Sequence, residues 1–280
     1  MKPGDITELQ FRQLCEFLYR ETGLTYNEAK RYYLERRVLD RMMAVCVTNF
    51  GDYFYHLRSR GTGELENFIN AVTVNETYFY REDYQLHCLT RHLLPERLAA
   101  ARARPGIRIW SLPCATGEEP FSIAIWLLEN WPEVDSHEIE IIGSDIDTKV
   151  LEAARGGVYG KRALMRLEAP LVERYFEPVD DENWRIIDDL RGSVQFSSAN
   201  AVEPADTSRF GRFDVIFCRN MLIYFDDASR RLAAENLYEA LLPGGYLCLG
   251  HAESMSRISS LFEICRYDDI IVYRRPLGAA

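Results

Sequence analysis

Two neighbouring carboxylates, Glu118 and Glu119, follow a short loop that contains a single glycine, Gly117. A dinucleotide pyrophosphate is usually wrapped by three glycines in the pattern G-x-G-x-x-G, so this loop does not predict a nicotinamide-dependent dehydrogenase. Two acids at a helix start would repel a phosphate, but they could accept hydrogen bonds from ribose hydroxyls or face a cation. S-adenosylmethionine offers both a ribose and a sulfonium cation. The alternative is that the two acids only favour the positive end of the helix dipole.

A third acid, Asp145, follows a second apolar run, Glu138–Ser144. In α/β nucleotide-binding folds, an acid at the end of the second strand commonly holds ribose hydroxyls. The position therefore predicts that Asp145 binds the ribose of the cofactor.

A second polar segment, CRNMLIYFD, begins with the last residue of the apolar run Phe213–Cys218. Because the carboxyl ends of parallel strands meet at one edge of a sheet, we expect Arg219, Asn220 and Tyr224 to lie near the glycine loop. The alternative is that Arg219 and Asn220 only cap backbone groups at the end of a strand.

Alternating strands and helices must position these residues. Ile107–Leu112 reads as a strand, and Pro120 suits the first turn of a helix that continues from Phe121. Further elements are expected at Val194–Ser197, Phe213–Cys218 and Tyr246–Gly250 (strands), Ala228–Leu242 (a helix closed by Pro243–Gly245) and Phe262–Arg275 (two strands). This alternation predicts a largely parallel sheet. Residues 156–193 break the alternation and read as an insertion with a strand at Trp184–Ile187.

Residues 1–74 read instead as helices. The second of them is expected to run to about Cys46, with Lys30, Arg37 and Arg41 together along the border of its apolar stripe. One interpretation is a docking surface for an acidic partner, and the other is an ordinary solvated face.

The junction between the two parts carries NETYFYR, Asn75–Arg81. Closely spaced aromatic residues beside an arginine often belong to a hydrophobic core, with the long arginine side chain reaching out to the solvent. Junctions between domains are also where ligand clefts form, so this segment is a candidate part of the site.

The whole chain has 280 residues, a 47% hydrophobic fraction and a formal net charge of −10. No apolar stretch reaches membrane-spanning length, and the first residues include acids where a secretory signal is apolar, so we expect a cytoplasmic protein that inserts into no membrane. A monomer is a separate expectation. The negative charge argues against nucleic acid as a partner. Seven scattered cysteines without a C-x-x-C pair argue against a disulfide framework and against a metal site.

Five segments in register carry a resemblance to a known family: NETYFYRE, WSLPCATGEEPFSIA, GSDIDTKVLEAAR, FDVIFCRNMLIYF and GGYLCLGHAES. The chain resembles the chemotaxis receptor glutamate methyltransferases, the CheR family, over nearly its whole length. The resemblance implies a Rossmann-like class I S-adenosylmethionine-dependent methyltransferase domain at residues 75–280, with an inserted antiparallel β-subdomain at 156–193. An all-α receptor-docking domain at residues 1–74 precedes it. The implied reaction is the methylation of glutamate side chains on the cytoplasmic helices of chemoreceptors.

The resemblance also implies which residues form the site. Arg81 and Tyr224 are the expected catalytic residues, with Tyr224 near the transferred methyl group. The expected cofactor-binding residues are Asn75, Thr77, Arg81, Glu118, Asp145, Asn200, Ala201, Arg219 and Asn220. A non-catalytic S-adenosylmethionine-binding adapter in a chemosensory complex is the alternative function, but such a protein would not need Arg81 and Tyr224.

One segment departs from the family pattern. Members that tether themselves to a receptor's C-terminal pentapeptide carry a glycine-bearing loop after a motif that here reads RYF, Arg174–Phe176. This chain continues with EPVDDENW, which is short, acidic and free of glycine. We therefore expect receptor recognition without the pentapeptide tether.

Overall fold

Four amphipathic helices form a bundle at the N-terminal end of the computed structural model, which describes residues 6–100 and 106–278. Thr7 and Gln10 form a capping box that starts the first helix. The buried faces of the four helices meet in a core of their own, which includes Leu14, Leu34 and Phe68. The helices are α1 (Glu8–Thr22), α2 (Arg31–Ala44), α3 (Phe50–Arg58) and α4 (Glu64–Val72).

The predicted second helix is shorter than expected at its start. Lys30 belongs to a separate 3-10 turn, Glu28–Lys30, and α2 begins at Arg31. The three basic residues therefore do not share one regular helix, and their spacing along the chain does not place them on one stripe.

The larger part is built on a seven-stranded sheet with the order β6-β2-β1-β7-β8-β10-β9. The first five strands of this order are parallel, whereas β10 pairs antiparallel with both β8 and β9. The predicted Rossmann-like fold is confirmed, and the strand order reverses beside β1, where ligands bind in such folds. The strands are β1 (Gly106–Ser111), β2 (Glu138–Asp145), β6 (Val194–Ser198), β7 (Phe213–Cys218), β8 (Leu241–Leu249), β9 (Glu263–Tyr267) and β10 (Ile270–Arg274).

The sequence placed the end of the last long helix too late. Helix α13 (Asp227–Ala240) ends at Ala240, and Leu241 already pairs with Phe213 in the sheet. An added Cβ at Gly245 would lie 3.0 Å from the Phe213 carbonyl oxygen and 3.1 Å from that of Asp214. The glycine therefore serves a close approach of two strands at a bulge, rather than the closure of a helix.

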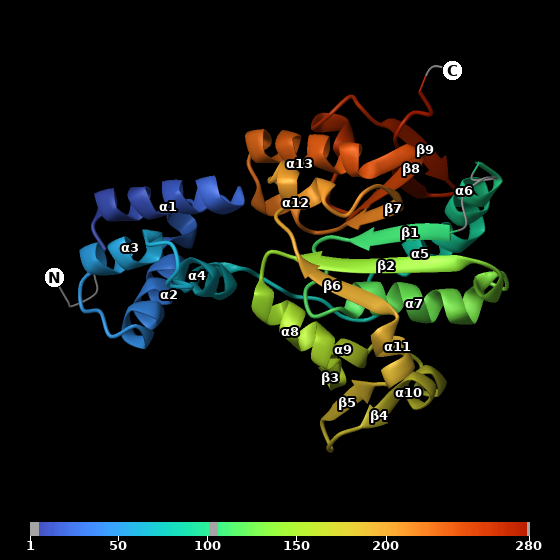
Figure 1. Ribbon diagram of the computed structural model, residues 1–280, viewed down its shortest axis with the longest axis horizontal. Coiled ribbons are helices and arrows are strands. Elements are labelled where there is room, and N and C mark those ends of the chain that lie inside the picture. Colours follow the sequence, from blue (N-terminus) through green and yellow to red (C-terminus); the bar gives the residue numbers. More distant parts are fainter. Residues whose placement is uncertain (1–5, 101–105, 279–280) are drawn as a thin grey trace.

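Helices cover both faces of the sheet (Figure 1). On one face the apolar core includes residues from α5 (Tyr84–Cys88), the following π-turn (Leu89–Leu93), α6 (Leu94–Ala100) and α7 (Glu118–Asn130). On the other face the apolar core includes residues from α13, and α12 (Pro204–Ser208) packs against α13.

The predicted insertion forms a second, three-stranded antiparallel sheet with the order β3-β5-β4. Phe79 contacts the rings of Tyr159 and Phe176 edge-on, which ties the insertion to the junction segment. Its elements are β3 (Val158–Gly160), α9 (Lys161–Leu164), α10 (Ala169–Tyr175), β4 (Phe176–Pro178), β5 (Asn183–Ile186) and α11 (Asp188–Gly192). Helix α8 (Thr148–Gly156) leads into it from β2.

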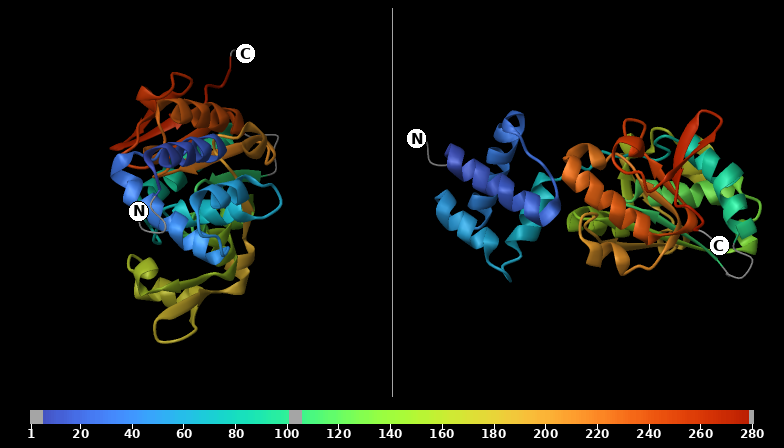
Figure 2. Two further views of the ribbon diagram at one scale, coloured as in Figure 1. Left: turned by 90° about the vertical axis from the view of Figure 1, so that its left-hand side faces the viewer. Right: turned by 90° about the horizontal axis from the view of Figure 1, so that it is seen from above.

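The bundle lies at one end of the long axis, beyond the carboxyl ends of the parallel strands (Figures 1 and 2). Each helix in the described ranges 6–100 and 106–278 is too short or too polar to cross a bilayer. The arrangement brings helical residues from the bundle to the edge of the sheet where a ligand is expected.

Candidate active site

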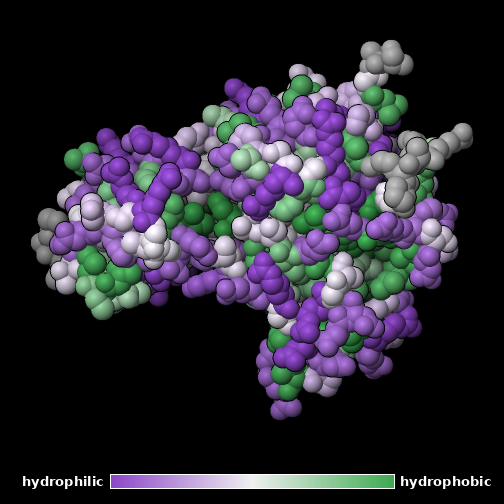
Figure 3. Space-filling view, in the orientation of Figure 1, coloured by the Kyte–Doolittle hydropathy of each residue, from purple (hydrophilic) through white to green (hydrophobic). Residues whose placement is uncertain are grey.

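A cavity of about 410 Å³ lies between the bundle and the carboxyl ends of the strands. Its walls come from residues within 22–33 of the bundle, from the junction 72–81, from Leu86 of α5 and from four segments at the ends of strands, within 112–122, 145–146, 199–201 and 219–225. Figure 3 shows apolar surface recessed between the bundle and the larger part. The volume falls within the range of small-molecule sites, about 300–1,000 Å³.

The loop between β1 and α7 forms one wall. Ala115 has a φ of +46° and Gly117 a φ of +94°. A Cβ on Gly117 would lie 3.1 Å from both the Ala154 Cβ and the Tyr159 hydroxyl, so this position favours glycine on two grounds. The tight loop turns the backbone amide of Ala115 toward the end of β2.

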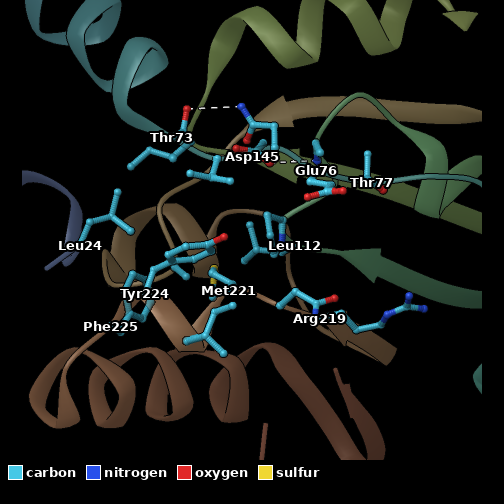
Figure 4. Close-up of a pocket in the computed structure, with 18 of the residues that line it drawn as sticks. Leu24, Thr73, Glu76, Thr77, Leu112, Asp145, Arg219, Met221, Tyr224 and Phe225 are labelled. Carbon is cyan, nitrogen blue, oxygen red and sulfur yellow. Dashed lines mark hydrogen bonds between the residues drawn. The ribbon is translucent and has the colours of Figure 1, made fainter. Parts of the chain in front are cut away.

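Asp145 lies where that amide points. Its Oδ2 accepts a hydrogen bond from the Ala115 N–H at 2.9 Å, and its Oδ1 accepts one from the Asp147 N–H at 3.0 Å. Burial raises the pKa of Asp145 to about 6, although both backbone donors favour the charged form. The Asp145 carboxyl is therefore held against the cavity in a fixed orientation (Figure 4).

The two glutamates of the loop have different environments. Glu118 is buried, accepts a hydrogen bond from Thr116 Oγ1 at 2.6 Å, and is not among the residues that line the cavity. Glu119 does line it, and its Oε2 lies 3.1 Å from Arg219 Nε. The structure therefore brings Glu119, and not the predicted Glu118, to the cavity wall.

The segment after β7 meets Glu119 there. Arg219 is 6% exposed, lies 3.9 Å from Glu82 as well, and donates to the Arg81 carbonyl. Asn220 has a φ of +59°, and its N–H donates to Glu253 Oε2 at 2.7 Å. Glu253 also accepts from the N–H groups of Leu222 and Gly250, so one half-buried carboxylate fixes this turn.

Tyr224 lies on the side of the cavity nearest the bundle, with its hydroxyl directed inward (Figure 4). Its carbonyl accepts hydrogen bonds from both the N–H and the Oγ1 of Thr25, each at 3.1 Å. The Lys30 ammonium lies 5.3 Å from the centre of the Tyr224 ring. Burial raises the pKa of Tyr224, so its hydroxyl stays protonated at neutral pH and can donate a hydrogen bond.

The junction segment supplies the remaining wall. Arg81 Nη1 donates to the Glu76 carbonyl at 2.8 Å, and the guanidinium lies 5.8 Å from the Tyr78 ring centre. Thr77 lines the same cavity. The amide of Asn75 donates to Asp147 Oδ2 at 2.7 Å, so its side chain is engaged by the loop after β2.

On the opposite side, Asn200 and Ala201 line the cavity from the segment that follows β6. Asn200 Nδ2 donates to the carbonyl of Glu21 in the bundle at 2.9 Å. The Ala201 carbonyl accepts from Asn236 Nδ2 at 2.9 Å. Eight of the nine predicted cofactor-binding residues thus surround one space, Glu118 being the exception.

The predicted basic stripe is divided by the structure. Lys30 lines the cavity, whereas Arg37 and Arg41 do not. Arg41 donates to both carboxylate oxygens of the buried Glu64, at 3.0 and 2.6 Å, so it holds α2 to α4. Arg37 lies 5.1 Å from the Tyr33 ring centre and is 40% exposed. Of the two arginines, Arg37 is therefore the one that remains suited to contact a partner.

These residues fit S-adenosylmethionine. Ala115 and Asn220 line the cavity in left-handed backbone conformations, and Tyr80 and Glu82, which flank the lining residue Arg81, also have a positive φ. Strained residues of this kind cluster at ligand sites. Asp145 offers acceptors for ribose hydroxyls, and the pair of Glu119 and Arg219 offers both charges to an amino-acid end. Among the described residues, the cavity walls contain no glycine, and so no three-glycine loop of the kind that binds a pyrophosphate.

Sequence reasoning missed several supporting residues. Glu253 and Asp147 bind backbone or side-chain donors of the site, and Glu82 lies 3.9 Å from Arg219, but none of the three was predicted. Glu253 could have been suspected, because it lies in the segment GHAES directly after β8. Asp147 follows Asp145 in the sequence DID, and only its three-dimensional partners distinguish the roles of the two acids.

Comparison with known proteins identifies the family. The domain described as "CheR methyltransferase, SAM binding domain" matches residues 75–271, and "CheR methyltransferase, all-alpha domain" matches residues 9–73. Chemotaxis protein methyltransferase 2 of Vibrio cholerae serotype O1 is 46% identical over 274 residues, covering 97% of this chain and 94% of that protein. Chemotaxis protein methyltransferase 2 of Pseudomonas aeruginosa is 39% identical, covering 91% and 90%. Chemotaxis protein methyltransferase of Salmonella typhimurium is 34% identical, covering 92% and 88%. The chain therefore belongs to the CheR methyltransferase family.

Proposed function

We propose that this protein transfers the methyl group of S-adenosylmethionine to glutamate side chains on the cytoplasmic helices of chemoreceptors, forming methyl esters. One observation carries the proposal. Arg81 and Tyr224 line the same cavity as Asp145. A carboxylate held by the first two residues can therefore meet a cofactor held by the third in one cavity.

The residues of the sheet edge would hold the cofactor. Asp145 is suited to accept hydrogen bonds from the ribose, and Glu119 with Arg219 to bind the charged ends of the methionine part. The family resemblance assigns Asn200 to the adenine side, and the presence of Asn200 and Ala201 in the cavity wall supports that role. Glu118 contributes by holding Thr116, and through it the shape of the loop.

The bound cofactor supplies an electrophilic methyl group on a sulfonium cation. A glutamate side chain has an ordinary pKa of about 4.3, so the accepting carboxylate is already ionised at neutral pH and needs no general base. The protein must therefore orient the carboxylate and exclude water. Arg81 can offer charge-assisted hydrogen bonds, Tyr224 a neutral one, and the nearby Lys30 adds positive potential.

We propose that receptors dock through the helical bundle and the cleft, without a pentapeptide tether. In the insertion, the edge strand β4 is three residues long and ends in Pro178. The following turn is acidic, and Asp180 Oδ1 accepts hydrogen bonds from the Glu182 N–H and the Asn183 amide. A peptide that added itself to β4 would meet a proline without an N–H group and a compact negative turn.

We further propose that residues 1–74 form the receptor-docking domain and residues 75–280 the methyltransferase domain, in a cytoplasmic monomer. The net charge of −10 supports a protein rather than a nucleic acid as substrate.

Calorimetry with S-adenosylmethionine, S-adenosylhomocysteine and NAD tests the cofactor assignment, and transfer of radiolabelled methyl groups to receptor cytoplasmic fragments tests the reaction. We expect binding of the first two ligands, no binding of NAD, and base-labile label on the receptor fragment. Cofactor binding without transfer to any receptor fragment would favour the adapter function. Binding of NAD alone would contradict the proposal.

A further inference from the structure

Asp147, at the start of α8, binds two parts of the chain at once. Its Oδ1 accepts hydrogen bonds from the N–H groups of Lys149 and Val150, which caps α8. Its Oδ2 accepts from Thr73 Oγ1 at 2.6 Å and from Asn75 Nδ2 at 2.7 Å. Asp147 is only 1% exposed. One buried carboxylate therefore joins the start of a sheet-domain helix to the segment that leaves the bundle.

The bundle contributes to the same helix start from α4. Asn70 Oδ1 accepts a hydrogen bond from the Thr148 N–H at 3.0 Å, and Asn70 Nδ2 donates to Thr148 Oγ1 at 2.9 Å. Thr148 Oγ1 donates in turn to Glu66 Oε1 at 2.6 Å. The first amide of α8 is thus capped by a residue of the bundle, so α8 is capped fully only while the bundle is docked.

The joint continues into the cofactor cavity through Asp145. The Asp147 N–H donates to Asp145 Oδ1, and Asp145 Oδ2 accepts from the Ala115 N–H. A continuous series of hydrogen bonds therefore runs from Thr73 and Asn75 to the loop after β1. Residues of the bundle, such as Leu24 and Tyr26, line the cavity at its other side.

We propose that Asp147 is a positioning residue that fixes the helical bundle over the cleft, and so couples the docking of the bundle to the binding of the cofactor. The coupling follows from linkage. If the cofactor binds better when the bundle is docked, then cofactor binding must stabilise the docked bundle by the same factor. The inference rests on the proposed function for the identity of the cofactor. It goes further by explaining how the helical bundle is held in a fixed position relative to the reacting groups.

Replacing Asp147 with Asn separates the two duties of the side chain. Asn is as good a helix cap as Asp, so the Asn oxygen can still serve Lys149 and Val150. Its amide then faces the amide of Asn75, which is also a donor, so this hydrogen bond is lost. The hydroxyl of Thr73 must change from donor to acceptor if it is to keep a hydrogen bond to residue 147. The start of α8 should therefore survive while its connection to the bundle weakens.

For Asp147→Asn, calorimetry should show about tenfold weaker S-adenosylmethionine binding, the effect of losing hydrogen bonds to a charged group. The receptor KM should rise severalfold while kcat at saturation changes less. In the wild type, hydrogen exchange at the Thr148 amide should slow when the cofactor binds, and in the variant this slowing should be lost. The proposal would be overturned if Asp147→Asn bound the cofactor with wild-type affinity and its Thr148 amide still showed the wild-type slowing of exchange on cofactor binding. The proposal would also be overturned if hydrogen exchange became faster throughout the bundle and the sheet domain alike while the folded protein still bound S-adenosylmethionine with normal affinity.

Asn70 provides a matched pair of variants. Asn70→Ala removes the acceptor for the Thr148 N–H and should weaken cofactor binding, whereas Asn70→Asp keeps an acceptor and should restore affinity to within about threefold of the wild type. Equal affinities for both variants would contradict the coupling.

The measurements of cofactor affinity and of amide exchange need no receptor. A wild-type protein that shows the coupling but methylates no receptor would refute the proposed function and leave this inference standing.

Discussion

Glu119 and Arg219 form an ion pair, with Glu119 Oε2 and Arg219 Nε 3.1 Å apart, where the loop after β1 meets the segment after β7. Both side chains are almost fully buried, at 12% and 4% exposure. The ion pair joins the two segments, the loop after β1 and the segment after β7, from which the site was predicted. It also leaves each residue dependent on the other, because a single buried charge is costly.

Glu119→Gln should lower the free energy of unfolding by about 3 kcal/mol, because it leaves the Arg219 guanidinium without its nearest carboxylate. The shape of the side chain and the hydrogen bond from Ser111 Oγ are retained. Urea denaturation measures the loss. Glu118→Gln is the matched control: its carboxylate has no ion pair among the described residues, so its cost should stay within about 1 kcal/mol. Similar losses for the two variants would show that the ion pair is not what stabilises this contact.

Cofactor affinity should depend on pH through Asp145, whose pKa burial raises to about 6. Ribose hydroxyls bind the ionised carboxylate more strongly, so affinity should be full above this pKa and fall by up to about tenfold per pH unit below it. Calorimetry at several pH values in two buffers should also detect proton release on binding near pH 6. Asp145→Asn should bind more weakly at neutral pH, with a flat profile over the same range. A flat wild-type profile would remove Asp145 from the ribose site.

The same shift affects the stability of the cofactor-free protein. In the unfolded chain the Asp145 carboxyl has its ordinary pKa of 3.8, so between this pH and about 6 the folded state retains a proton that the unfolded chain has released. The free energy of unfolding should therefore decrease as the pH rises through this window, by the contribution of this group. Comparison of wild type with Asp145→Asn by thermal denaturation across the window isolates that contribution.

Tyr224→Phe should lower turnover at least about tenfold while cofactor affinity stays within about threefold. The hydroxyl is proposed to hold the reacting carboxylate, whereas the contact with Thr25 uses the backbone carbonyl and survives the change. Single-turnover methyl transfer and calorimetry separate the two effects. Equal losses of rate and affinity would place the Tyr224 hydroxyl in the cofactor-binding site instead.

Arg37→Glu should raise the receptor KM about tenfold at low salt, because receptor methylation helices are rich in glutamate, and the effect should shrink as salt screens the charges. Arg12→Glu, at a side chain 74% exposed on α1, makes the same change in net charge and should have little effect. Arg41→Glu should instead destabilise the bundle, since it places a second carboxylate beside Glu64. A KM that is insensitive to Arg37 and to salt would make this arginine an ordinary solvated residue.

A free pentapeptide ending in Trp-Glu-Thr-Phe should give no heat of binding in calorimetry, and a receptor that lacks its C-terminal tail should be methylated at the normal rate. The reason is the acidic turn after Pro178, which repels a peptide that carries its own acid and carboxylate. Micromolar binding of the peptide would show that the short turn without glycine does not prevent strand addition.

The sequence alone determined the main elements and most of the site. Alternating apolar runs predicted the strands β1, β2, β6 and β7, because strand positions depend on local periodicity. Since parallel strands end at one edge, the polar residues after them, such as Asp145 and Arg219, had to lie close together. Local signals were weakest where a strand continues directly from a helix. Leu241–Gly245 resembles the end of a helix, and only pairing with β7 makes it a strand.

Tertiary structure alone decided which side chains face the cavity and which are held by partners distant in the chain. Glu118 and Glu119 are chemically identical neighbours, and only the rotation of α7 and the approach of Arg219 select Glu119. Arg41 has the sequence spacing predicted for a docking residue, but in the structure it forms an ion pair with Glu64. Asp147 has its role because it binds Thr73 and Asn75, which lie more than 70 positions earlier in the chain. Sequence periodicity shows which face of an element is buried, whereas the choice of partner depends on how separate elements pack.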